Sequence, residues 1–267
     1  SPILNKGKVY LTTFSGTLYK LRSSDGKIEQ AARLKPTSLP TIAGNHIYIT
    51  QRRKKKGKVY EAVVELNQDL TIRRTLAVHP APYLDFAFVK KGKLKRNARK
   101  WDASNGFPSA PDIAGWRKAS QLIGQSNVSS LQNFVGSTVV YDHKHVFTTM
   151  GDTIRCISLA SGEEVWAYGI EGSLLKEGGH LATMPLVSNE FVVSVTHNGK
   201  VLLLDKATGD LKESFATKTY VRNQPVIVDG KIYVSSTTGK MSCIDTQNKA
   251  LDGWPMFLKN NSHDFSN

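Results

Sequence analysis

Residues 225–245 read Pro-Val-Ile-Val-Asp-Gly-Lys-Ile-Tyr-Val-Ser-Ser-Thr-Thr-Gly-Lys-Met-Ser-Cys-Ile-Asp. Apolar residues alternate with polar ones before the turn at Thr238-Gly239, starting at Ile232, and again after it, starting at Met241. A period of two on both sides of a glycine turn indicates a β-hairpin with one buried face and one solvent-exposed face. The recurrence of this unit, rather than any single copy, predicts the fold.

The same unit recurs with fixed spacing. From the turn residue Gly239, six residues lead to Asp245 and four more lead to Lys249. Three further copies keep both offsets: Gly16, Arg22 and Gly26; Asp152, Ser158 and Gly162; Gly199, Asp205 and Gly209. Strand-forming segments precede and follow each turn, and the turn residues suit a backbone with positive φ.

Two looser copies extend the pattern. Residues 44–50 open a fifth copy, residues 51–57 are interpreted as a lengthened turn, and residues 59–66 form the returning strand. A sixth copy is suggested by residues 86–106, where Asp102 and Gly106 keep the offset of four. The turns that end successive copies are then about 37 to 56 residues apart, close to the ~40–50 residues of a four-stranded propeller blade.

These repeats predict an all-β protein, a β-propeller of four-stranded antiparallel blades with about six repeats and five to seven as the range. We expect one propeller domain over residues 1–258, with an irregular insertion near 76–133, and a flexible polar tail over residues 259–267. Apolar residues at spacing three predict a short helix over residues 112–122. The start of the chain resembles the lead-in to a strand, which leaves open a missing upstream blade or signal peptide.

Charge is the second informative feature. The net charge is +14, and two segments carry much of the excess: residues 52–58 hold six Lys or Arg, and residues 90–100 hold seven. Such clusters are interpreted as solvated loop tips that aid solubility. The alternative is a face that binds an anionic partner, such as nucleic acid, phosphorylated lipid or acidic glycan. No apolar run is long enough to span a membrane.

The aligned unit resembles the PQQ-like, or quinoprotein-type, propeller repeat. Residues 204–209, Leu-Asp-Lys-Ala-Thr-Gly, and residues 229–233, Asp-Gly-Lys-Ile-Tyr, carry the resemblance, and Gly162 with Trp166 matches the family's closing glycine and docking tryptophan. In the other copies the tryptophan position holds Gln30, Glu213 and Gly253. The family includes quinone-dependent dehydrogenases and non-catalytic scaffolds such as the lipoprotein of the outer-membrane β-barrel assembly machinery. The resemblance also implies a periplasmic or extracytoplasmic location.

No catalytic or metal site stands out among the residues. Cys156 and Cys243 occupy the same repeat position and are interpreted as two small buried residues, with a disulfide as the alternative. They are not adjacent, so they do not match the vicinal disulfide of the family's alcohol dehydrogenases. His143 and His145 have a spacing that zinc can use, but no partner ligands are evident. We expect no catalytic residues, no metal and no cofactor.

The sequence therefore favours a non-catalytic propeller that binds or scaffolds another protein or an anionic ligand. The alternatives are a PQQ-dependent oxidoreductase and a protein that binds nucleic acid or acidic glycan. The oligomeric state is left open. We expect the partner on the loop-bearing face, at basic and aromatic residues of the two segments: Arg52, Arg53, Lys54, Lys55, Lys56, Lys90, Lys91, Lys93, Lys95, Arg96, Arg99, Lys100, Trp101 and Trp116.

Overall fold

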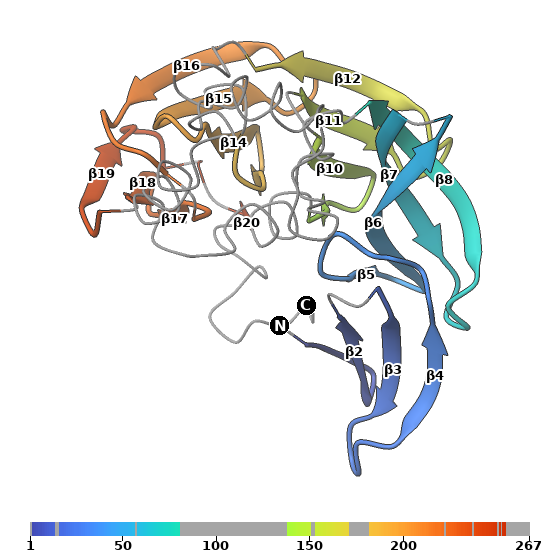
Figure 1. Ribbon diagram of the computed structural model, residues 1–267. Coiled ribbons are helices and arrows are strands. Elements are labelled where there is room, and N and C mark those ends of the chain that lie inside the picture. The colour runs from blue at the N-terminus through green and yellow to red at the C-terminus, as the bar shows by residue number, and fades with distance from the viewer. Residues whose placement is uncertain are drawn as a thin grey trace, which may run out of the picture.

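The computed structural model describes residues 2–13, 16–56, 58–80, 138–150, 153–170, 182–221, 223–236, 238–249, 251 and 253–254. Every regular element in these ranges is a β-strand, and the strands pair antiparallel in five sheets (Figure 1). The fold is the all-β propeller that the repeats predict, with the sheets following one another in chain order along an arc.

The first three sheets each contain four strands, which follow one another across the sheet in the order of the chain. Their bounds are β1 Ile3–Asn5, β2 Lys8–Thr12, β3 Leu18–Arg22 and β4 Ile28–Ala32; β5 Thr41–Ala43, β6 His46–Lys55, β7 Lys58–Leu66 and β8 Ile72–Pro80; β9 Val140–Tyr141, β10 His145–Met150, β11 Thr153–Ser158 and β12 Glu164–Gly169.

The last two sheets depart from this pattern. Their strands are β13 Leu186–Ser188, β14 Phe191–Val195, β15 Lys200–Asp205 and β16 Leu211–Ala216; β17 Val226–Val228, β18 Lys231–Ser235 and β19 Met241–Asp245; and β20 Gly253–Trp254. β20 pairs with β13, in the preceding sheet, and not with β19. In the described residues the last sheet therefore has three strands, where the repeat predicted four.

The predicted hairpins are present in all four gapless copies, as β2–β3, β10–β11, β14–β15 and β18–β19. The turn residues Gly16, Gly199 and Gly239 have φ of 96°, 88° and 83°, values that glycine adopts without strain. Asp152, which stands in the glycine position of the remaining copy, lies outside the described residues.

The fifth copy is also a hairpin, but the prediction of a lengthened turn over residues 51–57 is wrong. β6 continues to Lys55 and β7 begins at Lys58, with Lys55 opposite Lys58 in the register. The extra residues lengthen the two strands rather than the loop, because ladder pairing continues along the whole insertion. The basic residues 52–55 are consequently strand residues.

The second and third sheets contact each other directly. The Thr41 hydroxyl donates to the Val139 carbonyl, and a core cluster joins both sheets through Tyr48 and Val63 on one side and Val146 and Ile157 on the other. Residues 86–106 and the predicted helix over 112–122 lie outside the described residues.

Neighbouring sheets are tied at the turn after each third strand, here called the closing turn. In the turn 205–209, the Lys206 carbonyl accepts a hydrogen bond of 2.9 Å from the indole Nε1 of Trp166. A Cβ on Gly209 would lie 2.6 Å from the Trp166 ring, so the ring rests directly on this glycine. Trp166 is only 8% exposed, which confirms the docking tryptophan that the sequence predicted.

Arg74 takes the place of this tryptophan one sheet earlier. Arg74 lies opposite Glu65 in the register as Trp166 lies opposite Cys156. Its guanidinium donates to the Leu159 and Ala160 carbonyls and lies against Gly162 in the closing turn 158–162. The sequence alignment missed this equivalence, because Leu70 holds the glycine position in the second sheet, with φ of 63°.

The first and second sheets are tied at the corresponding carbonyl of the closing turn 67–70. Lys20 Nζ donates to the Gln68 carbonyl at 2.9 Å, and the Tyr10 hydroxyl donates to the Gln68 side chain at 2.8 Å. Three successive junctions thus use one acceptor position and three different donor side chains, so these sheets are joined without a repeated tryptophan.

Candidate binding surface

The β6–β7 hairpin carries the first basic segment on paired strands. Gln51 is buried, and its side-chain amide donates to the Leu34 carbonyl at 2.7 Å. The amide oxygen of Gln51 accepts hydrogen bonds from Arg53 at 3.2 Å and 3.0 Å. Because Gln51 is anchored to the segment before β5, it holds the exposed Arg53 guanidinium in one orientation.

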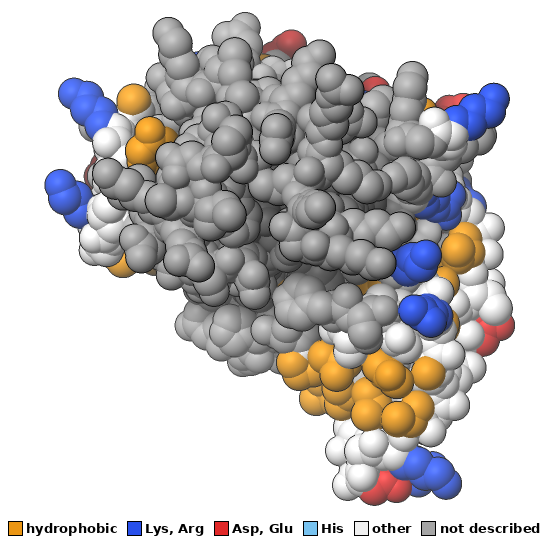
Figure 2. All heavy atoms as spheres, in the orientation of Figure 1, with side chains coloured by type: hydrophobic (Ala, Val, Ile, Leu, Met, Phe, Trp, Pro, Cys, Tyr) orange, Lys and Arg blue, Asp and Glu red, His pale blue; other side chains and the backbone are white. Residues whose placement is uncertain are grey.

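The end of the hairpin presents further positive charge. Lys56 is exposed in the turn, with φ of 48°, and Figure 2 shows Lys and Arg side chains over the β5–β8 sheet. The backbone of Arg52, Lys54 and Lys55 lies in β6, so these residues share the hairpin with Arg53 and Lys56. A positive potential on this hairpin suits an anionic or acidic partner.

The second basic segment lies outside the described residues. This applies to Lys90, Lys91, Lys93, Lys95, Arg96, Arg99, Lys100, Trp101 and Trp116. That the two segments share one face therefore stays a prediction.

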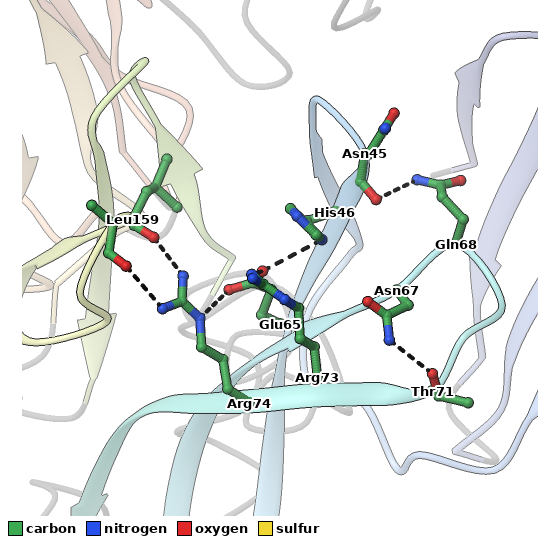
Figure 3. A network of polar contacts seen from close by, with 10 residues as sticks. Asn45, His46, Glu65, Asn67, Gln68, Thr71, Arg73, Arg74 and Leu159 are labelled. Atoms are coloured by element: carbon green, nitrogen blue, oxygen red, sulfur yellow. Dashed lines mark hydrogen bonds and ion pairs between the residues drawn. The ribbon is translucent and has the colours of Figure 1, made fainter.

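A buried charge cluster, which the sequence did not reveal, lies at the foot of the same hairpin (Figure 3). The Glu65 side chain is 0% exposed and pairs with Arg73 and Arg74, and its Oε1 lies 3.4 Å from His46 Nδ1. Burial by itself would raise the pKa of Glu65, but the hydrogen bonds from Arg74 and Arg73 lower it below the usual value. Glu65 therefore stays ionised at neutral pH.

The cluster joins the second and third sheets. Each Glu65 oxygen is engaged by an arginine, and Arg74 also holds the neighbouring sheet. The nearby Tyr48 hydroxyl is buried close to the Glu65 charge, and together these raise the pKa of Tyr48 to about 12. His46 is partly buried, and its side chain lies against Glu65.

The two cysteines do not behave alike. Cys156 is buried beside Trp166, and burial raises the pKa of its thiol to about 12. Cys243 is exposed, so the prediction that both are buried is wrong for this residue, and neither is in a disulfide. Cys156 belongs to a core cluster that also contains residues of the β13–β16 sheet, whereas Cys243 lies in the last sheet of the arc.

Within the described ranges, no three His, Cys, Asp or Glu side chains are grouped so that they could hold a metal ion. His145 Nδ1 lies 3.5 Å from Asp142, and the His145 ring packs edge-on against Phe147. The same ranges contain no helix that is long and apolar enough to cross a membrane.

Part of the chain matches a known protein family. Residues 113–219 match the PQQ-like family described as "Outer membrane protein assembly factor BamB", which confirms the predicted PQQ-like type for the repeats within these residues. No curated protein matches the chain.

Two solved structures are similar in shape. The computationally designed Ika8 protein aligns with a TM-score of 0.52 at 14% identity, covering 91% of this chain and 56% of that one. BamB from Moraxella catarrhalis aligns with a TM-score of 0.43 at 12% identity, covering 91% and 68%. The chain thus spans little more than half the length of the designed protein, and the likeness to that protein concerns the fold alone.

Proposed function

We propose that this propeller of PQQ-like repeats is a non-catalytic binding module that docks a protein partner through the basic β6–β7 hairpin. The observation that carries the proposal is the anchored Arg53, held by a buried Gln51 on a hairpin that is extended by basic residues. A surface charge that is fixed in place loses little conformational entropy on binding, so it contributes more to affinity than a mobile one.

The family match supports a protein partner, because the matched family is named for an assembly factor of outer-membrane proteins. It also supports an extracytoplasmic location, which we include in the proposal. The net charge of +14 means that an acidic surface on the partner would be attracted at long range. The same positive field would also attract phosphate-rich partners. The experiment therefore compares two variants that lose the same number of charges at different positions.

The test replaces Arg52, Arg53, Lys54 and Lys55 by Ser and measures the salt concentration that elutes the protein from heparin resin. A charge-matched control replaces Lys6, Lys27, Lys144 and Lys218, four exposed lysines on turns outside the hairpin, by Ser. We expect the hairpin variant to elute at clearly lower salt than the control variant. Equal elution of the two variants would mean that only net charge matters and would refute the hairpin site.

A second variant isolates the anchoring. Gln51→Leu keeps every positive charge but removes the amide that holds Arg53. We expect retention between that of the wild type and that of the hairpin variant, with melting temperature as the control for folding. Retention equal to the wild type would show that the anchored orientation of Arg53 contributes nothing.

A further inference from the structure

The outer strand of the second sheet is longer than the outer strands of the first, third and fourth sheets. β8 has nine residues, whereas β4 has five and β12 and β16 have six each. The whole of β8 pairs with β7, from Ile72 opposite Leu66 to Pro80 opposite Tyr60, and among the described residues no strand pairs with the other side of β8. Every second residue of such a strand directs its backbone N–H and C=O away from the paired strand. β8 therefore presents a long row of backbone hydrogen-bonding groups at the edge of its sheet.

The second half of β8 lacks the features that protect an edge strand from pairing. Proteins usually block an exposed edge with charged side chains, with proline or with a bulge. Residues 75–79, Thr-Leu-Ala-Val-His, contain no Lys, Arg, Asp, Glu or Pro, and Val78 is 51% exposed. Both register shifts between β7 and β8 lie before Ala77, so the ladder from Ala77 to Pro80 is regular. An extended segment of another chain can add to an edge of this kind as a further strand.

The charges on the outer strands select the kind of segment. The outer strands of the first, third and fourth sheets each carry one glutamate: Glu29, Glu164 and Glu213. β8 carries Arg73 and Arg74 instead, and the Arg73 side chain is 46% exposed. The two glutamates of β7, Glu61 and Glu65, are 2% and 0% exposed, so they present no acidic surface there. An acidic segment would therefore meet like charge on the other three strands but not on β8.

The sheet that contains this edge also contains the basic hairpin, because β8 pairs with β7 and β7 pairs with β6. We propose that an extended acidic segment of the partner protein docks by pairing with β8 as an added fifth strand, with apolar side chains against Val78. Docking at β8 rests on the proposed function, since the hairpin supplies the charge that attracts the segment. A second copy of this chain is a poorer occupant, because two copies would bring together their basic hairpins and net charges of +14 each.

A peptide of alternating acidic and apolar residues, Glu-Val-Glu-Val-Glu-Val-Glu-Val, is a suitable probe. We would measure the fluorescence anisotropy of this peptide, labelled with a dye, on titration with the full chain. The control peptide is N-methylated at two consecutive central residues, which removes a backbone donor from each of its edges and leaves its charge unchanged. We expect saturable binding of the unmodified peptide and about tenfold weaker binding of the methylated one, because strand pairing depends on backbone hydrogen bonds.

A matched pair of variants locates the site. Val78→Glu places an acidic side chain on the open edge strand, where it would repel the acidic peptide and remove an apolar contact. Val165→Glu is the control, because Val165 is a valine of similar exposure, 48%, on the outer strand β12 of the third sheet. Both variants change the net charge by the same amount. We expect about tenfold weaker peptide binding for Val78→Glu only, with melting temperatures as the control for folding.

Several results would overturn docking at β8. Equal binding of the two peptides would show that charge alone holds the segment, equal binding to the two variants would place it elsewhere, and absence of binding would show that the edge accepts no strand. Sedimentation that shows a dimer of the wild type, lost in Val78→Glu, would assign the edge to a second copy instead.

The same measurements separate this site from the hairpin. Peptide binding that is lost in Val78→Glu but unchanged by the four serine substitutions at residues 52–55 would refute the hairpin alone. Heparin retention that depends on residues 52–55, together with equal binding of the two peptides, would refute docking at β8 alone.

Discussion

Two successive junctions dock a side chain on the closing turn of the next sheet, one with an apolar ring and the other with a charged group. The first joins sheets β9–β12 and β13–β16, and the second joins sheets β5–β8 and β9–β12. Trp166 covers Gly209 and donates to the Lys206 carbonyl from an apolar setting beside Cys156. Arg74 lies against Gly162 and donates to the Leu159 carbonyl, and its charge is balanced by the buried Glu65. The two closing turns share one backbone geometry, so in both the docking side chain lies on a glycine and donates to the same carbonyl position. The residue opposite in the register, Cys156 or Glu65, decides which side chain can do this.

The comparison predicts unequal sensitivity to removal of charge. Glu65→Gln would leave Arg73 and Arg74 without their counter-ion, and we expect the free energy of unfolding to fall by about 3–5 kcal/mol. The double variant Glu65→Cys, Arg74→Trp copies the Cys156–Trp166 pair into this junction, and we expect it to be within about 1–2 kcal/mol of the wild type. Urea unfolding measures both. A double variant no more stable than Glu65→Gln would show that the two junctions are not interchangeable.

At the apolar junction, we expect removal of the Trp166 ring to lower the stability of the protein more than loss of its hydrogen bond alone. Trp166→Ala removes a buried ring, and we expect a loss of about 3–4 kcal/mol. Trp166→Phe keeps most of the ring and loses only the donor to Lys206, for about 1 kcal/mol. Thermal unfolding of the two variants separates packing from hydrogen bonding, and similar losses in both would contradict this division.

The closing glycines offer a third comparison. Alanine at Gly209 is strained by φ of 78° and would meet the Trp166 ring at 2.6 Å, whereas alanine at Gly26 has the strain alone. We expect Gly26→Ala to cost about 1 kcal/mol and Gly209→Ala about 2 kcal/mol more. Chemical denaturation of the pair gives the difference directly. Equal losses would mean that Trp166 moves aside without cost.

Acid should affect the polar junction more than the apolar one. The lowered pKa of Glu65 in the folded protein means that its contribution is fully present above the unfolded pKa, near 4.5, and is lost as pH falls through the folded value. We expect the wild type to lose more stability below pH 4.5 than the double variant, which lacks this carboxylate. Denaturation curves at a series of pH values test this, and parallel losses in both proteins would assign the acid sensitivity to other groups.

Much of the local structure was predictable because its causes are local. The hairpins β2–β3, β14–β15 and β18–β19 follow from alternation and from glycines that take positive φ, both of which act within a few residues. The basic β6–β7 segment was also found, but it was predicted to be a loop, because a run of Lys and Arg gives no sign that ladder pairing continues through it.

The sequence alone determined the repeat, its strands and the one docking tryptophan, since these depend on neighbouring residues in the chain. Only the tertiary structure decided that Arg74 replaces that tryptophan, that β20 pairs with β13, and that Cys156 is buried while Cys243 is exposed. Each of these depends on which sheet stands next to which. A side chain can have its partner in a neighbouring sheet that is remote in sequence, as Arg74 does in Leu159. The sequence of a single copy of the repeat does not specify that neighbour.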